Sequence, residues 1–167
     1  DRTYVALNEG ADLVVEIPVV CAVADAGRYA KASVGILKAL GCDAIAFGSE
    51  SGDYESLFRV AERLKTHADE INQHISILRK QGISYPAARE QAYIALFNPD
   101  DSSPDLDILS SPNDILGIEY IKYADGMDVI PVKRQGAGYY DDRDETKDFQ
   151  SASGIRKAVL KGESVIS

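Results

Sequence analysis

Three short apolar segments, separated by longer helix-like stretches, most constrain the fold of this chain. They span residues 13–17, 44–47 and 129–132. The first two are apolar runs of strand length, which predicts buried strands of a parallel sheet. Pro131 lies inside the third segment and limits it to a short or edge strand. Strands that alternate with helices indicate an open α/β sheet, whose ligands bind beyond the carboxyl ends of the strands.

The remaining stretches show the three- and four-residue spacing of amphipathic helices. We expect helices over residues 1–9, 22–40, 53–65, 66–79, 84–97 and 113–124, and a last one from about residue 151. Residues 98–107 and 141–148 are acidic and rich in turn residues, which predicts surface loops.

Composition excludes several classes of protein. No apolar run approaches the roughly 20 residues of a membrane helix. The net charge of −9 argues against binding nucleic acid by bulk electrostatics, although it leaves room for a local basic groove. Cys21 and Cys42 are too few for a zinc site, and their apolar surroundings predict reduced thiols in a cytoplasmic protein.

The segment 110–122, SSPNDILGIEYIK, is the first candidate site. Pro112 marks a boundary, and Asn113 is a suitable cap for the helix that follows. The first turn of that helix carries free amide donors, which suit an anionic or polar ligand. An ordinary capped helix is the alternative.

A glycine-bounded loop, residues 48–52, follows the strand predicted at 44–47 and is the second candidate site. Gly48 therefore lies at the sheet edge where ligands of α/β proteins bind. A plain turn is the alternative, because Gly and Ser are common turn residues and neither GxxxxGK[ST] nor GxGxxG occurs.

The start of the last helix is the third candidate site. Ser151 or Ser153 can cap this helix, and Arg156 lies about one turn further on. Backbone amides, a hydroxyl and a guanidinium in one turn suit a phosphate group, although a capping serine near an arginine is also commonplace. Lys133 and Arg134 can add positive charge, or can form a solvated cationic pair.

Other polar residues give no legible catalytic set. His67 and His74 are seven residues apart among acidic and amide side chains, which favours a solvated helix face over a metal pair. The carboxylates Asp12, Glu16, Glu50 and Glu119 are scattered, and nothing in their spacing pairs them. We therefore expect no metal site and no acid–base dyad.

Several strings taken together resemble one family. These are GADLVVEIP at 10–18, FGSE at 47–50, SYPAAR at 84–89, SSPNDILGIEYIK at 110–122, KRQGAGYY at 133–140 and SASGIR at 151–156. In this order they resemble the bacterial tRNA(Met) cytidine acetate ligases. The resemblance implies a Rossmann-like nucleotidyltransferase fold of the HUP type, a parallel sheet with flanking helices that is incomplete at its N-terminus. It implies a single domain over residues 1–167, with a helical insertion at about 66–98.

The resemblance also implies a reaction and its ligands. Such an enzyme uses ATP, with Mg²⁺, to activate acetate as acetyl-adenylate. The acetyl group then passes to the N4 amine of the wobble cytidine of elongator tRNA(Met), in the cytoplasm. By motif position, Gly48, Asn113 and Arg134 would contact ATP. Ser153 and Arg156 match the phosphate-binding helix start of the superfamily.

One departure from the family pattern concerns catalysis. The family begins with a strand and a histidine motif of the HxGH type, which supports adenylyl transfer, and this sequence contains no such string. We therefore expect an internal piece of the enzyme that has weak or no activity by itself, and the catalytic residues remain unidentified. Two alternatives stay open: a small-molecule adenylyltransferase of the same superfamily, and a non-catalytic nucleotide-binding domain.

Overall fold

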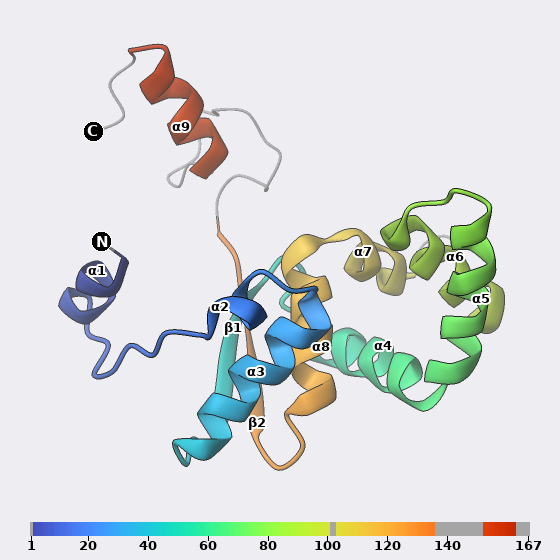
Figure 1. Ribbon diagram of the computed structural model, residues 1–167, viewed down its shortest axis with the longest axis horizontal. Coiled ribbons are helices and arrows are strands. Elements are labelled where there is room, and N and C mark those ends of the chain that lie inside the picture. Colours follow the sequence, from blue (N-terminus) through green and yellow to red (C-terminus); the bar gives the residue numbers. More distant parts are fainter. Residues whose placement is uncertain (1, 101–102, 136–151, 163–167) are drawn as a thin grey trace. The chain divides into compact units, whose positions relative to one another are not determined.

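The computed structural model describes residues 2–100, 103–135 and 152–162, which belong to two compact units, Asp1–Val132 and Lys133–Ser167. Its elements, in chain order, are α1 (Arg2–Asn8), α2 (Val19–Ala22), α3 (Ala26–Ala39), β1 (Ala44–Ser49), α4 (Tyr54–Thr66), α5 (Ala68–Lys80), α6 (Tyr85–Phe97), α7 (Pro104–Ser110), α8 (Pro112–Tyr123), β2 (Asp128–Lys133) and α9 (Ala152–Leu160) (Figure 1). Most predicted helices and two of the three predicted strands are therefore confirmed.

β1 and β2 pair in a two-stranded parallel sheet. The amide of Asp128 donates to the carbonyl of Asp43 at 2.8 Å, so both strands start at the same end of the sheet. Helix α8 packs against β1, and this close packing depends on Gly117, because a Cβ there would clash with the ring of Phe47. The start of α8 is thereby held near the carboxyl end of β1.

The main core lies among helices α4 to α8. In α4, Leu57, Val60, Ala61 and Leu64 are buried at the helical spacing that the sequence shows. Tyr93 of α6 and Ile118 of α8 are fully buried against them. A smaller cluster joins Val34 of α3, Ile45 of β1 and Ala124.

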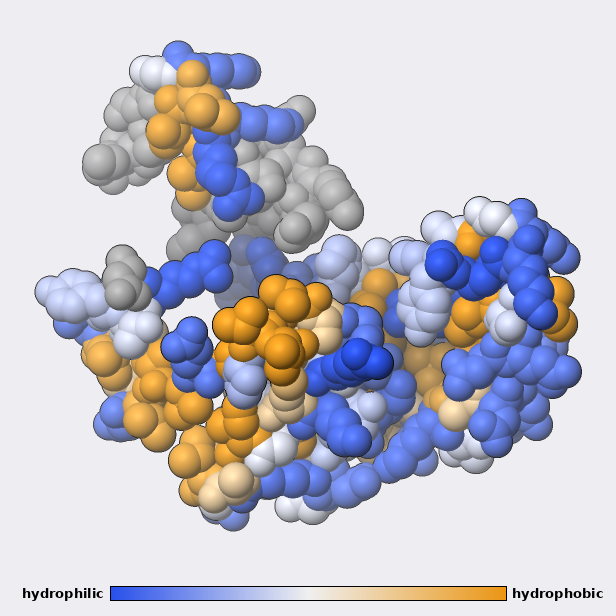
Figure 2. Space-filling model, in the orientation of Figure 1, coloured by the Kyte–Doolittle hydropathy of each residue, from blue (hydrophilic) through white to orange (hydrophobic). Residues whose placement is uncertain are grey.

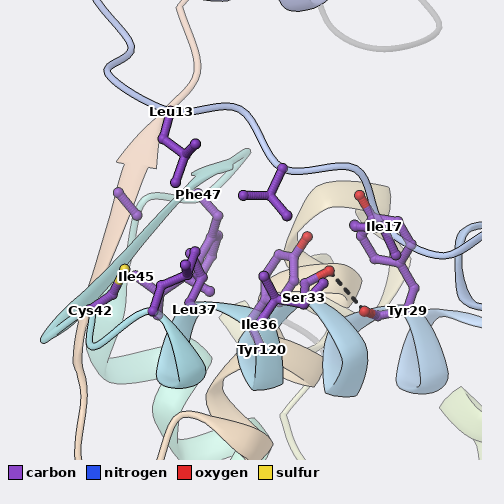
Figure 3. A pocket seen from close by; sticks show the side chains of 13 residues that line it. Leu13, Ile17, Tyr29, Ser33, Ile36, Leu37, Cys42, Ile45, Phe47 and Tyr120 are labelled. Carbon is purple, nitrogen blue, oxygen red and sulfur yellow. Dashed lines mark hydrogen bonds between the residues drawn. The ribbon is translucent and has the colours of Figure 1, made fainter.

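The strand predicted at 13–17 is wrong. This segment has no regular secondary structure, and Leu13 is 64% exposed. A strand needs a neighbour to take its backbone hydrogen bonds, and the segment finds none among the described residues. Figure 3 shows Leu13 and Ile17 facing α3 and β1 across an apolar cavity of about 400 Å³, whose other walls include Tyr29, Phe47 and Tyr120.

Two further element predictions need correction. The helix predicted over 22–40 begins later, at Ala26, because Asp25 caps α3 by accepting from the amide of Arg28 at 3.0 Å. The loop predicted over 98–107 ends early, because α7 begins at Pro104. Asp105 in this segment is buried and pairs with two arginines that lie more than 40 residues away in the sequence. Local composition cannot reveal such a pairing.

The two histidines do not share a helix face. His67 lies between α4 and α5, and its ring centroid is 5.1 Å from that of Phe97, whereas His74 is exposed on α5. Helices α5 and α6 occupy most of the span predicted as a helical insertion, and its status as an insertion stays a prediction. An apolar patch covers α2 (Figure 2), where Val19, Val20 and neighbouring Val23 are exposed. Within the described part of the chain, no helix has the length and hydrophobicity needed to cross a membrane.

Candidate nucleotide site

The candidate site lies where β1 ends and α8 begins. The carboxylate of Asp114 accepts a short hydrogen bond from the Ser49 hydroxyl. It also accepts from the amides of Glu50 and Ser51, each at 3.0 Å. Asp114 is 1% exposed and has no cationic partner among the described residues, so these donors and the start of its own helix stabilise its charge.

Glu50 makes the reciprocal contact, because it lies in the loop and accepts hydrogen bonds from the start of α8. Its carboxylate accepts from the amides of Asn113 at 3.2 Å and Asp114 at 2.9 Å. It also accepts from the side-chain amide of Asn113 at 2.6 Å. Loop and helix therefore cap each other reciprocally, over a sequence distance of about 64 residues.

The same loop leads directly into α4. Asp53 caps this helix by accepting from the hydroxyl of Ser56 at 2.6 Å and from its amide at 3.2 Å. These two hydrogen bonds hold the pKa of Asp53 below its usual value. Ser49 also accepts from the amide of Gly52 at 2.8 Å, so both ends of the loop are fixed. The loop is a hydrogen-bonded turn rather than an open cradle.

The structure brings two predicted site residues together. Gly48 is exposed within β1, one residue before the strand ends, so the strand runs past the predicted loop start. Asn113 is the second residue of α8, linked to the loop through Glu50. The cap is at Ser111 rather than Asn113, because Pro112 takes the first helical position. The amides expected to face a ligand at this helix start are occupied by Glu50 instead.

The other predicted site residues belong to the second unit. Arg134 is exposed just after β2. Helix α9 begins at Ala152, close to its predicted start, and Arg156 lies exposed on it. Ser151, residues 136–150 and the side chain of Ser153 lie outside what the structure describes. The convergence of Gly48, Asn113 and Arg156 therefore stays a prediction.

Sequence reasoning missed the residues that build this corner, namely Ser49 and Asp114, and left Glu50 unpaired. A serine and a glutamate after a strand, and an aspartate in a first helical turn, are each ordinary. They interact only because α8 packs against β1 and brings the loop and the helix start together. Among the described residues, no three His, Cys, Asp or Glu side chains come together as a metal site.

A second buried cluster lies under α7. Asp105 accepts from Arg59, from Arg63 at 2.9 Å and from the Tyr93 hydroxyl at 2.7 Å. Burial by itself raises the pKa of Asp105, but the hydrogen bonds from Arg59 and Tyr93 and the arginine charges outweigh it and hold the pKa below its usual value. Burial raises the pKa of Tyr93 to about 12. The cluster joins α4, α6 and α7, and every charged member has a partner.

The comparisons with known proteins agree with this architecture. A family model described as HIGH Nucleotidyl Transferase matches residues 1–166, and the chain therefore belongs to this family. Among curated relatives, the tRNA(Met) cytidine acetate ligase of Fervidobacterium nodosum is 44% identical and that of Syntrophotalea carbinolica is 39% identical. The matches cover 97% and 98% of this chain but only 38% and 39% of the relatives.

Solved structures give the same result. The chain is similar to Thermotoga maritima TmcAL in its apo form, with 36% identity and a TM-score of 0.81 over 97% of this chain and 40% of that chain. It is also similar to TmcAL bound with alpha-thio ATP, with a TM-score of 0.76 over 96% of this chain and 38% of that chain. The chain thus spans about two fifths of the proteins that it matches.

Proposed function

We propose that this chain is part of an ATP-dependent ligase that acetylates the wobble cytidine of elongator tRNA(Met). The observation that carries the proposal is the match to proteins named tRNA(Met) cytidine acetate ligase. The one from Fervidobacterium nodosum is 44% identical and matches 97% of this chain. One similar structure holds alpha-thio ATP, which supports ATP as the nucleotide. With ATP, acetate and tRNA as substrates, the proposed location is the cytoplasm.

We propose that Gly48 and Asn113 contact the nucleoside part of ATP rather than its phosphates. The loop amides after β1 already hold Asp114, and the α8 amides already hold Glu50. A carboxylate only accepts hydrogen bonds, so the side-chain NH₂ of Asn113 faces Glu50 and its carbonyl oxygen remains as an acceptor. Such an acceptor suits a ribose hydroxyl or an adenine amino group.

For the phosphates we propose the residues that the sequence motifs imply. Arg134, Ser153 and Arg156 would offer guanidinium, hydroxyl and helix-start donors to them. Mg²⁺ usually keeps several waters and binds through substrate phosphates with one or two carboxylates, so it would arrive with ATP.

The proposed first step joins acetate to ATP. An acetate oxygen forms a bond to the α-phosphorus, the bond from that phosphorus to the bridging oxygen breaks, and pyrophosphate leaves. The site would accelerate this step by holding both substrates close and by offsetting charge at the α-phosphate. In the second step the cytidine N4 amine attacks the acetyl carbon, and AMP leaves.

Acetate-dependent exchange of labelled pyrophosphate into ATP tests the first step. A protein that carries this chain together with its family's upstream histidine segment is expected to catalyse the exchange, and the chain alone weakly or not at all. Absence of exchange in the longer protein contradicts the ligase assignment. N4-acetylcytidine in tRNA as the product supports it, whereas a soluble adenylylated metabolite favours the adenylyltransferase alternative.

Calorimetric titration of ATP tests the proposed contacts in that longer protein. Asn113→Ala and Arg134→Ala are each expected to weaken ATP binding, with about a tenfold loss for the arginine because it would make a charged hydrogen bond. Arg79→Ala, at an exposed position on α5, is the matched control and should bind like the wild type. Unchanged affinity in both site variants refutes this placement.

A further inference from the structure

A cavity of about 500 Å³ lies among the start of α3, helix α6 and helix α8. Asp25 to Arg28 of α3, Arg89 of α6 and Glu119 and Lys122 of α8 line it. All of these residues belong to the first unit. Arg89 is the last residue of the SYPAAR string, and the nucleotide site described above gives it no role.

Arg89 is a buried cation with little compensation. Arg89 is 6% exposed, and its buried Nε has no hydrogen-bond partner among the described residues. Its Nη2 donates to the carbonyl of Leu109 at 3.4 Å, which is a long hydrogen bond. Burial lowers the pKa of Arg89, and Tyr85, Glu119 and Glu90 oppose this only through longer-range attraction. A buried charge without a close partner is strongly unfavourable.

The other charges that line the cavity are matched in pairs. Asp25 Oδ2 lies 3.6 Å from Arg28 Nε, and Glu119 Oε2 lies 2.8 Å from Lys122 Nζ. Among the described lining residues, Arg89 is then left without a counter-charge in contact. The cavity wall therefore carries one net positive charge.

The start of α3 adds a second feature that favours an anion. This helix has 14 residues, and its first turn lines the cavity with the positive end of its dipole. Gly27 in that turn lets the carboxylates of Asp25 and Glu119 approach the helix start, since a Cβ there would lie 3.2 Å from Asp25 Oδ1 and 3.4 Å from Glu119 Oε2. The dipole of α3 and the guanidinium of Arg89 both act on this cavity.

We propose that this cavity binds a small carboxylate through Arg89, and that this carboxylate is the acetate substrate. The identification as acetate rests on the proposed function. A monoanion matches the single unbalanced charge, whereas a phosphate dianion would leave one negative charge in excess. The planar guanidinium can donate two parallel hydrogen bonds to a carboxylate.

The cavity and the proposed ATP site share helix α8. Glu119 of the cavity follows Asp114 by five residues, which is about 7.5 Å along the helix axis and more than a third of a turn around it. The proposal therefore places acetate on the side of α8 that faces α3 and α6.

Titration of the ¹⁵N-labelled chain with sodium acetate, followed through its arginine Nε–H signals, tests the binding. The Arg89 signal is identified by its absence in Arg89→Lys, and Arg28→Lys is the matched control at the same cavity. We expect a saturable shift of the Arg89 signal with acetate and not with sodium chloride at equal ionic strength. A shift that is absent, or equal in chloride, overturns the proposal, as does stronger saturation by inorganic phosphate. Should Arg89→Lys not fold, triple-resonance assignment of the wild-type chain identifies the signal and the titration decides by itself.

Exchange kinetics of the longer protein separate this inference from the proposed function. Arg89→Lys is expected to raise the KM for acetate about tenfold or more and to leave the KM for ATP unchanged, because one charged contact to acetate is weakened. Exchange with an unchanged KM for acetate overturns the role of Arg89 and leaves the ligase function intact. No exchange in the wild-type protein refutes the ligase function, and the acetate titration of the chain still decides whether the cavity binds a carboxylate.

Discussion

Two buried charges in the helical part of the first unit differ in how they are compensated. Asp105 is 1% exposed and is held by Arg59, Arg63 and Tyr93. Arg89 is 6% exposed, and its one described hydrogen bond goes to the carbonyl of Leu109. Both lie near α7, yet only one of them is neutralised within the fold.

The difference separates structure from function. A buried charge that has its partners in the chain is compensated within the fold and needs no ligand. A buried charge without a partner persists where something outside the described chain supplies one, and an anionic substrate is such a partner. Asp105 is therefore interpreted as structural and Arg89 as substrate-binding.

The largest expected effect is that of Asp105→Asn on stability. The change leaves two guanidinium groups without their carboxylate, and it should lower the free energy of unfolding by about 3 kcal/mol. Urea denaturation of the chain measures this. Asp125→Asn removes the exposed pair with Lys65 and is the matched control, with no measurable change expected. Equal effects in the two variants would show that the buried cluster does not hold α4, α6 and α7 together.

Asp114→Asn is expected to have the next largest effect. The neutral amide cannot accept from Ser49, Glu50 and Ser51 as well as the carboxylate does, so the free energy of unfolding should fall by about 2 kcal/mol. The same denaturation experiment measures it, with the exposed Asp128→Asn as control. Stability close to that of the wild type would contradict the reciprocal capping of loop and helix.

These two carboxylates also show what the sequence could reveal. The helices around Leu57 and Tyr93 and the strands at 44–47 and 129–132 follow from local spacing, and the structure confirms them. The loop predicted over Asp105, and the missed pairing of Glu50 with Asp114, depended on partners 40 to 65 residues away. Tertiary packing brings these groups together, and periodicity carries no information on it.

Acid unfolding sharpens the interpretation of Asp105. Its pKa is lowered in the folded chain, so its contribution is fully present above the unfolded value of about 3.9 and is lost as the pH falls through the lower folded value. The stability gap between wild type and Asp105→Asn should therefore narrow between pH 6 and pH 2. Denaturation curves at several pH values measure it, and a gap that is constant with pH would contradict the ion-pair interpretation.

The smallest expected effect concerns helix capping near the candidate site. Asp53→Ala removes the cap of α4 and should lower the free energy of unfolding by about 1 kcal/mol. Ser84→Ala is the matched control at the start of α6, because Ser84 makes no side-chain cap hydrogen bond there. An equal loss of unfolding free energy in both variants would show that the effect comes from backbone propensity rather than from the cap.

Thermal unfolding in acetate compares the two buried charges most directly. A ligand that binds only the folded chain raises its Tm. The account predicts that sodium acetate, relative to sodium chloride at equal ionic strength, raises the Tm of the wild type and of Asp105→Asn by the same amount and leaves Arg89→Lys unchanged. Equal increments in the wild type and Arg89→Lys would contradict it.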